Sequence, residues 1–417
     1  MQLKRVVVTG MGALTPIGNS LNEYWDALIA GKSGAAPITL FDASLFKTQF
    51  ACEIKNFNVE DHIDKKEARK LDQFSQYAMV SATEAMADSA LLDSNPNLDR
   101  IGVIWGSGVG GLKTFQDESK AFFEGDGTPR FNPFFIPKMI ADIAAGHISI
   151  KYGLRGPNYV TVSACASSTN AIIDAFNLIR LGKADAIVTG GSEAAVNEMG
   201  MGGFNALKAL STRNDSPQTA SRPFDSERDG FVLGEGAGAL ILEEYEHAVK
   251  RGANIYAEVM GGGMSGDAYH MTAPHPEGLG ARNTMLAAIE DAEISPTEID
   301  YVNVHGTSTP LGDVAEVKAI QAVFGDHAYK LNISSTKSMT GHLLGAAGAI
   351  EAIACVMAVK NDVIPPTINH FNDDPELDSN LNFTFNQAQK RVVNFALSNT
   401  FGFGGHNTSV IVKKFTK

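Results

Sequence analysis

Short apolar runs alternate along the chain with longer segments in which apolar residues recur every three or four positions. The runs at 101–105, 186–189 and 301–304 have the length and character of buried strands. Between two of them, the apolar residues of 171–179 recur at helical spacing, and Gly182 follows as a stop signal. This alternation of strands and helices predicts an α/β fold.

The order of these elements also repeats. A strand, a turn of small residues and a long helix occur at 159–182 and again at 331–360. The first strand with its glycine turn, at 5–12, has a counterpart at 255–266. The repeat predicts two similar halves, residues 1–253 and 254–417. We expect the equivalent turns of the two halves to face each other.

Composition narrows the class of protein. The 417 residues are 44% hydrophobic and 19% charged, which is typical of a globular chain too long for one ordinary core. The net charge of −13 argues against nucleic acid as the main partner, because phosphate binding needs a basic surface. Cys52, Cys165 and Cys355 lie far apart and show no metal-ligand spacing. We therefore expect a reducing, cytoplasmic compartment and no metal site.

Two segments bear on membrane association. We expect the run at 1–8 to form a strand, and it lacks the pattern of a signal peptide. The longest small-apolar stretch, 345–359, contains Glu351 and is too short to cross a bilayer. We predict a core helix there and expect no membrane partner.

Cys165 stands in a run of small residues, 162–168, between a predicted strand and a predicted helix. Unpaired N–H groups and the dipole at a helix N-terminus stabilise an anion, so a thiol there is expected to ionise more easily and to act as a nucleophile. A buried, unreactive cysteine is also common. On this segment alone, both interpretations stay open.

Polar clusters follow strand-like runs in the second half, which is where α/β folds place their chemistry. They contain His305, then Lys337 and His342, and finally a glycine-rich loop around Phe403. Each histidine alone could be structural. A cysteine with two histidines and a lysine fits covalent acyl transfer, and the second histidine suggests a second oxyanion, such as an enolate.

Four motifs carry a resemblance to a known family: Ala164-Cys165-Ala166-Ser167, His305-Gly306-Thr307-Ser308-Thr309, Lys337-Ser338-Met339-Thr340-Gly341-His342 and Gly402-Phe403-Gly404-Gly405. Together they resemble the β-ketoacyl-[acyl-carrier-protein] synthases, and within them the synthase II group, over essentially the whole chain. The resemblance implies the thiolase-like fold, with duplicated βαβαβαββ halves in a five-layer αβαβα sandwich, and a homodimer. It also implies a decarboxylative Claisen condensation that elongates fatty acids by two carbons.

The same resemblance implies roles for single residues. Cys165 would hold the acyl group, the N–H groups of Cys165 and Phe403 would form its oxyanion hole, and Lys337 would set the polarity around His342. His305 and His342 would bind the malonyl thioester oxygen. Glu351 and Asp313 would form a supporting network. The substrate channel would be lined by Thr307, Thr309, Val109, Phe204, Thr272 and Phe401. The face that docks the carrier protein would consist of Lys66, Arg69, Lys70, Arg130 and Lys208.

Several alternatives remain at this point. The basic residues at 65–70 fit one face of a helical stretch, which could dock an acidic acyl carrier protein or simply be solvated. A type I synthase or a polyketide ketosynthase would differ only in acyl preference. A thiolase that uses coenzyme A would need a second catalytic cysteine near the last glycine loop. A non-catalytic chain-length factor usually lacks the cysteine that corresponds to Cys165. We expect no resident cofactor, because phosphopantetheine arrives on the carrier protein.

Overall fold

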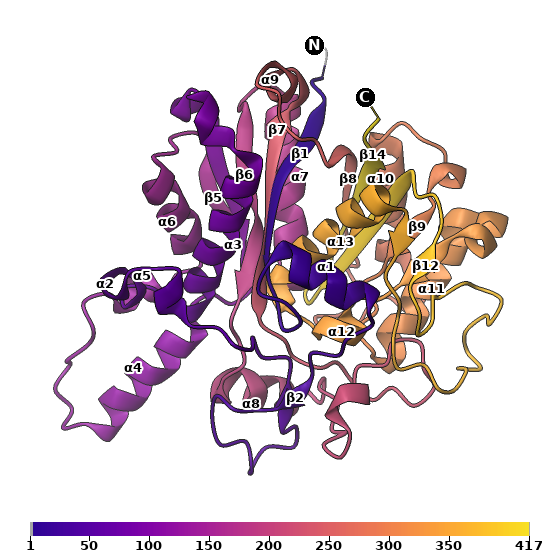
Figure 1. The fold of residues 1–417 in the computed structure, drawn as a ribbon. Coiled ribbons are helices and arrows are strands. Elements are labelled where there is room, and N and C mark those ends of the chain that lie inside the picture. Colours follow the sequence, from indigo (N-terminus) through magenta and orange to yellow (C-terminus); the bar gives the residue numbers. More distant parts are fainter. Residues whose placement is uncertain (1–2, 417) are drawn as a thin grey trace.

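The computed structural model describes residues 3–416, and its first half repeats the predicted alternation (Figure 1). The order is β1 (Val6–Leu14), α3 (Gln73–Ser89), β4 (Ile101–Gly106), α6 (Ile143–Tyr152), β5 (Asn158–Thr161), α7 (Ser167–Arg180), β6 (Ala186–Glu193) and β7 (Gly236–Glu244). Additional helices are α1 (Leu21–Ile29), α2 (Lys65–Ala68), α4 (Leu112–Glu124), α5 (Phe135–Met139), α8 (Glu198–Ala206) and α9 (Tyr245–Lys250). This core order is βαβαβαββ.

The second half has the same order of elements. It comprises β8 (Ala257–Gly266), α10 (Leu279–Asp291), β9 (Tyr301–Asn303), α11 (Pro310–Phe324), β10 (Asn332–Ser334), α13 (Ala347–Asn361), β13 (Phe395–Gly402) and β14 (His406–Lys414), with the short helix α12 (Lys337–Thr340) before α13. Two-stranded ladders pair β2 (Ala36–Pro37) with β3 (Phe50–Ala51) and β11 (Val363–Ile364) with β12 (Gln389–Lys390). The predicted boundary at 253 and 254 falls between α9 and β8; as a division into domains it stays a prediction.

The sheet shows the duplication in space. Its ten strands run β10-β9-β13-β14-β8-β1-β7-β6-β4-β5, so each half reads outward from the centre in the same pattern. The halves meet where Val6–Val8 of β1 pair antiparallel with Ala257–Val259 of β8. In both halves the two outer pairings are parallel and the inner pairings antiparallel. The predicted thiolase-like fold is therefore confirmed.

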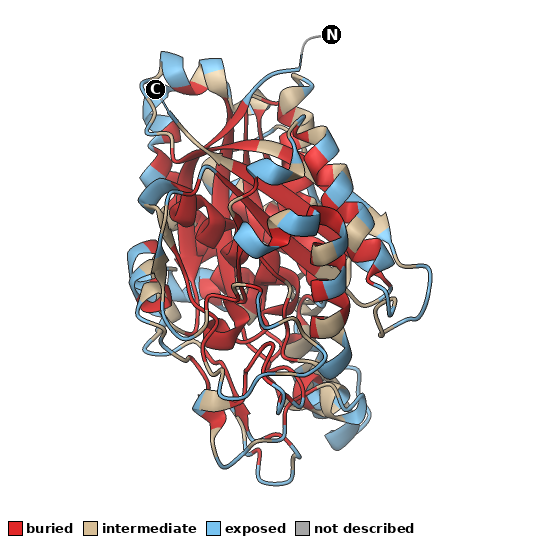
Figure 2. Cartoon of the chain, turned by 90° about the vertical axis from the view of Figure 1, so that its right-hand side faces the viewer, coloured by how far each residue is buried: buried red, intermediate tan, exposed pale blue. Residues whose placement is uncertain are grey.

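Helices cover the sheet in layers. α3 and α6 pack on the outer face of the first half, and α10 and α11 on that of the second. α7 and α13 contact each other and strands of both halves, so they form the central layer (Figure 1). Buried residues concentrate in the strands and central helices, while the outer helices alternate buried and exposed positions (Figure 2). This is the five-layer arrangement that the duplication predicts.

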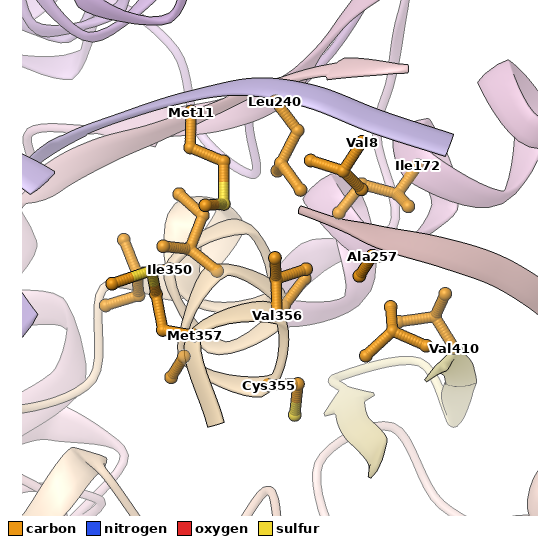
Figure 3. Packing of buried hydrophobic residues seen from close by; sticks show 14 of the residues in the cluster. Val8, Met11, Ile172, Leu240, Ala257, Ile350, Cys355, Val356, Met357 and Val410 are labelled. Carbon is orange, nitrogen blue, oxygen red and sulfur yellow. The ribbon is translucent and has the colours of Figure 1, made fainter. Parts of the chain in front are cut away.

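α13 is the centre of the largest hydrophobic cluster. All residues from Ala347 to Val359 are buried, and Ile350, Val356 and Met357 pack near Met11 of β1 and other strand residues (Figure 3). The expectation that this stretch is too short to cross a bilayer was wrong, because by length and composition Leu344–Asn361 could do so; yet 89% of it is buried inside the protein. A helix that is apolar on every side has to be buried in this way. The predicted core helix is confirmed.

Candidate active site

Cys165 lies on a tight turn between β5 and α7. Ala164–Ala166 form a single 3-10 turn, η4, and Ala164 has a φ of +51°, a left-handed conformation that is costly for a residue with a side chain. Such strain at a strand-to-helix turn is typical of functional positions. The Cys165 side chain is 8% exposed and lines a cavity of about 420 Å³. The sulfur is therefore at the wall of the cavity, not sealed in the core.

His342 reaches Cys165 from the other half of the chain. Its Nε2 lies 3.1 Å from the cysteine Sγ, and either tautomer of the neutral ring satisfies this contact. The backbone holds the histidine from behind, since its N–H donates to the Val232 carbonyl at 2.7 Å and its carbonyl accepts from the Gly234 N–H at 2.9 Å. The Phe231 ring meets the imidazole edge to face, with centroids 5.3 Å apart. His342 is thus fixed in position beside the sulfur.

His305 completes the group at the end of β9. Its ring is nearly perpendicular to that of His342, with centroids 5.2 Å apart, and both line the cavity. The backbone N–H groups of His305 and Gly306 donate to the two carboxylate oxygens of Glu316, at 2.9 and 2.8 Å. One buried carboxylate therefore fixes the loop that carries this histidine.

Lys337 and Glu351 form a buried ion pair beneath the histidines. Both side chains are 1% exposed. Burial raises the pKa of Glu351 to about 7, while the charge of Lys337 opposes that shift. The structure thus joins Lys337, on α12, to Glu351, on α13, while their predicted roles around His342 and in a supporting network stay predictions.

The electrostatics of the three central groups are those of neutral species. Burial lowers the pKa of His305 and of His342 well below the ordinary value, and the charge of Lys337 lowers both further. Burial raises the pKa of Cys165 to about 12, although Lys337 and a backbone N–H of Phe403 act in the opposite direction. The expectation of a readily ionised thiol was wrong, because the loss of hydration outweighs the helix N-terminus at this depth.

The loop after β13 brings a hydrogen-bond donor to the sulfur. The backbone N–H of Phe403 lies close enough to Cys165 to lower the pKa of its thiol. Gly402 allows this approach, because a Cβ there would lie 2.7 Å from the carbonyl oxygen of Ser163 and 3.1 Å from the nitrogen of Cys165. Two N–H groups near the sulfur can stabilise an oxyanion that forms on a bound acyl group.

The cavity also collects most of the predicted substrate-binding residues. Its lining includes Thr307, Thr309, Thr272, Phe204, Phe401 and Phe403. The hydroxyls of Thr307 and Thr309 lie 3.1 Å apart. Val109 is not part of this lining and is 45% exposed, so its contribution to an acyl pocket stays a prediction.

Asp313 supports the site without entering it. Its carboxylate accepts hydrogen bonds from the N–H groups of Ser308 and Phe224, at 3.2 and 3.0 Å, and pairs with Arg228 at 3.4 Å. Burial raises its pKa, and Arg228 opposes the shift. The residue therefore fixes the backbone that follows His305.

The predicted docking residues lie on three separate segments. The expected helical stretch at 65–70 is one turn, α2, with Arg69 as its C-cap. Lys66 and Arg69 are exposed, and Lys70, just after the helix, pairs with Glu67 at 2.7 Å. Arg130 lies in the connection between α4 and α5, on an arm that projects from the body (Figure 1). Lys208 follows α8 and lines the cavity. The basic residues at 65–70 thus share one short helical turn, and the docking role of all five residues stays a prediction.

Sequence reasoning missed two carboxylates that hold the site together. Glu193 ends β6, is fully buried and accepts backbone hydrogen bonds, and Glu316 anchors His305 as described above. The available signal was a charged residue inside an otherwise apolar segment, which is rarely buried without partners.

Comparison with known proteins places these features in a family. Residues 3–248 match the model for the beta-ketoacyl synthase N-terminal domain, and residues 256–371 match the model for its C-terminal domain. The chain is 53% identical, over 99% of both chains, to 3-oxoacyl-[acyl-carrier-protein] synthase 2 of Staphylococcus aureus (strain COL), and 50% identical to the protein of that name from Synechocystis, over 100% of this chain and 99% of that protein.

Solved structures agree with these matches. A beta-ketoacyl synthase from Burkholderia phymatum superposes with a TM-score of 0.91 at 36% identity, covering 99% of this chain and 100% of that one. A type II polyketide ketosynthase, solved in complex with its acyl-carrier protein, also reaches 0.91, at 33% identity and full coverage of both chains. With matching sequence models, full-length relatives and this fold, the chain belongs to the β-ketoacyl synthase family.

Proposed function

We propose that this protein is a 3-oxoacyl-[acyl-carrier-protein] synthase that extends fatty acyl chains by condensing them with malonyl-acyl-carrier protein. The observation that carries the proposal is the convergence of Cys165, His342 and His305 on one cavity, which Phe403 also lines. This set suits a covalent acyl intermediate followed by a step with a second developing oxyanion.

The first half-reaction loads the enzyme. The Cys165 sulfur attacks the carbonyl carbon of the acyl thioester, and its proton passes to Nε2 of the adjacent His342. The negative charge on the carbonyl oxygen is stabilised by the N–H groups of Cys165 and Phe403. When the tetrahedral intermediate collapses, the carrier thiolate leaves and takes up the proton. The products are an acyl thioester on Cys165 and a free carrier thiol.

The second half-reaction forms the carbon–carbon bond. The thioester oxygen of malonyl-carrier protein lies between the two imidazoles, whose neutral state lets each donate a hydrogen bond. Loss of CO2 leaves an enolate, and these two donors stabilise its oxygen. The enolate carbon attacks the acyl carbonyl, the bond to the sulfur breaks, and a β-ketoacyl chain two carbons longer departs on the carrier. The Cys165 thiolate that leaves takes up one proton from solvent, so the condensation consumes one proton for each CO2 released.

The partner and the assembly are part of the proposal. Phosphopantetheine on the carrier enters past Thr307, Thr309 and Thr272, and Lys66, Arg69, Lys70, Arg130 and Lys208 receive the acidic carrier surface. A homodimer is supported by β5, the last strand in the sheet order, and by Val162 beside it, which is 63% exposed. Sedimentation of the purified protein tests the dimer, and fractionation of the source cell tests a cytoplasmic location.

The decisive experiment separates the two half-reactions in a Cys165→Gln variant. We expect chain extension with acyl- and malonyl-carrier proteins to be lost, because there is no sulfur to acylate. Malonyl decarboxylation should persist, because both imidazoles remain. Cys165→Ala should lose condensation as well. Condensation at the wild-type rate in either variant would overturn the assignment of the nucleophile and the proposed function with it.

A polyketide ketosynthase would use the same chemistry, so only acyl preference separates it from the proposal. A turnover series with carrier proteins bearing saturated acyl chains of increasing length distinguishes the two. A non-catalytic chain-length factor is disfavoured, since this chain has the cysteine and both histidines at the cavity and Lys337 buried in an ion pair with Glu351.

A further inference from the structure

Glu193 lies at the point where the two halves of the duplicated fold meet behind the active site. It is the last residue of β6 and is 0% exposed. Its Oε2 accepts hydrogen bonds from the N–H of Gly108 at 2.8 Å and from the N–H of Gly345 at 3.0 Å. Its Oε1 accepts from the N–H groups of Val109 and Gly110 and from the Ser107 hydroxyl, at 3.1, 3.2 and 3.1 Å. Five donors thus converge on one carboxylate.

One segment that Glu193 joins lies against the turn of the nucleophile, and the other follows His342. Gly108 lies directly against the Cys165 turn, because a Cβ on Gly108 would be 3.2 Å from the carbonyl oxygen of Ala164. Gly345 lies in the turn η8 (Leu344–Ala346), three residues after His342. The carboxylate therefore links the surroundings of the nucleophile to the segment that holds its imidazole partner.

The duplication explains why a carboxylate fits here. η8 is the counterpart of η4, and its first residue, Leu344, has a φ of +47° where Ala164 has +51°. Gly345 therefore occupies the position equivalent to Cys165. A Cβ on Gly345 would lie 2.6 Å from Glu193 Oε2 and 2.2 Å from the nitrogen of Gly108. The second half has no side chain at this position, and the space holds the Glu193 carboxylate.

We propose that Glu193 is a positioning residue. It fixes the position of the Cys165 turn relative to the His342 turn and so maintains the contact between Sγ and Nε2. The proposal rests on the proposed function only for its acyl-transfer readout. A carboxylate suits the task because it offers acceptors alone, whereas a glutamine would direct an NH2 group at backbone donors and leave some of them unpaired.

Glu193 also acts on the sulfur through its charge. Among the groups around Cys165, Lys337 lowers the pKa of the thiol, whereas Glu193 and Glu351 raise it after the larger effect of burial. His342, which contacts the sulfur, and His305, which lines the same cavity, are neutral rings, since burial and Lys337 lower the pKa of both. Replacing the carboxylate by an uncharged amide should therefore make the thiol easier to ionise while it disturbs the geometry.

The test is a Glu193→Gln variant with two readouts that should move in opposite directions. We expect transfer of an acyl group from carrier protein to Cys165 to slow by about 10- to 100-fold, the range that a small misplacement of reacting groups costs. We expect the pH at which iodoacetamide alkylates Cys165 at a given rate to shift downward, as followed by peptide mass spectrometry. The alkylation readout needs no carrier substrate, so it stays informative if the proposed function fails.

A matched control separates positioning from folding. Glu84 also accepts two backbone hydrogen bonds, from Ala13 and Leu21, both at 2.8 Å, but it lies on α3 away from the cavity. Glu84→Gln should leave acyl transfer and alkylation per folded molecule unchanged. Ser107→Ala removes one donor to Glu193 and should slow acyl transfer by a smaller factor in the same direction, even if Glu193→Gln does not fold. Wild-type acyl transfer and an unshifted alkylation profile in the folded variants would overturn the proposal.

Discussion

At the residue scale, the site works with neutral groups that burial keeps neutral. The two imidazoles and the thiol are all poorly hydrated, and Lys337 supplies the positive charge beneath them. Because its pKa is lowered, each imidazole stays uncharged around neutral pH. It therefore keeps one N–H that can donate a hydrogen bond, and its protonation state does not change with pH in that range. In the proposed mechanism the thiol therefore loses its proton to His342 only when substrate is bound.

The first prediction concerns the pH dependence of the Cys165 thiol. Its pKa is raised to about 12 by burial, so the reactive thiolate is scarce at neutral pH and increases with every step toward alkaline pH. The rate of iodoacetamide labelling at Cys165 should therefore keep rising beyond pH 9. A plateau below pH 8 would show that the resting residue is a thiolate.

The second prediction distinguishes the two histidines. His305→Ala removes one donor to the enolate oxygen but leaves the contact between His342 and the sulfur. Malonyl decarboxylation should fall by about 100- to 1,000-fold, the usual cost of losing one oxyanion donor. Trapping of radiolabelled acyl groups on Cys165 should stay near the wild-type rate. Equal losses in both half-reactions would mean that the two imidazoles act as one unit.

At the element scale, the site depends on tight turns at the ends of buried elements. The 3-10 turns η4 and η8 aim side chains at the cavity, and the loop after β13 closes against η4. Each turn is held by a long central helix, α7 or α13, so their separation is fixed by core packing. Small changes in these turns should therefore affect chemistry more than overall stability.

The third prediction tests the loop after β13. In Gly402→Ala the added methyl would lie 2.7 Å from the Ser163 carbonyl oxygen, so the loop has to move and carry the Phe403 N–H away from the sulfur. Acyl transfer should fall about 10- to 100-fold, while decarboxylation changes less. Gly146→Ala on α6 is the control, because the nearest atom to the new Cβ is 3.9 Å away. It should leave both acyl transfer and decarboxylation unchanged. Unchanged acyl transfer in Gly402→Ala would remove Phe403 from the oxyanion hole.

At the scale of the whole molecule, buried carboxyl groups link folding to pH. Glu235 is 1% exposed, accepts from the Tyr77 hydroxyl at 3.1 Å and from the Ile54 N–H at 3.2 Å, and has its pKa raised to about 8 by burial. The folded state therefore binds a proton that the unfolded state has released. This contribution is fully present below about pH 4.5 and is lost as the pH rises through 8.

The fourth prediction follows from this loss of stability with rising pH. The free energy of unfolding of the wild type should fall between pH 6 and pH 9 by about 2–3 kcal/mol relative to Glu235→Gln, which has no such proton to lose. Urea unfolding of both proteins at the two pH values measures this difference. A constant difference would show that Glu235 is ionised in the folded protein at both pH values.

Much of this molecule could be predicted from its sequence because local signals and global fold agree. The duplicated order of elements, the helix at 345–359 and the turn at Cys165 follow from apolar periodicity and from the placement of small residues. The motifs around His305 and His342 indicated the chemistry. These features are encoded within short segments, so no knowledge of distant contacts was needed.

Other properties depend on contacts between distant segments. The direction of the Cys165 pKa shift follows from burial by both halves, which local helix position does not reveal. Glu193 gained its role from donors at 107–110 and 345, which only the folded chain brings together. The basic run at 65–70 has helical spacing but ends after one turn, because a new helix begins at Gln73 with Asp72 as its N-cap.

The division of the reacting groups between the repeats has a practical consequence. The sulfur comes from one repeat and the imidazoles with their lysine from the other, and the connection from 251 to 256 is the covalent bridge between these sets. A chain cut in that bridge would yield two inactive fragments, each with an exposed apolar face of α7 or α13. Any turnover after mixing them would require the two fragments to associate. The recovered activity would therefore measure their association, as in a split-enzyme assay.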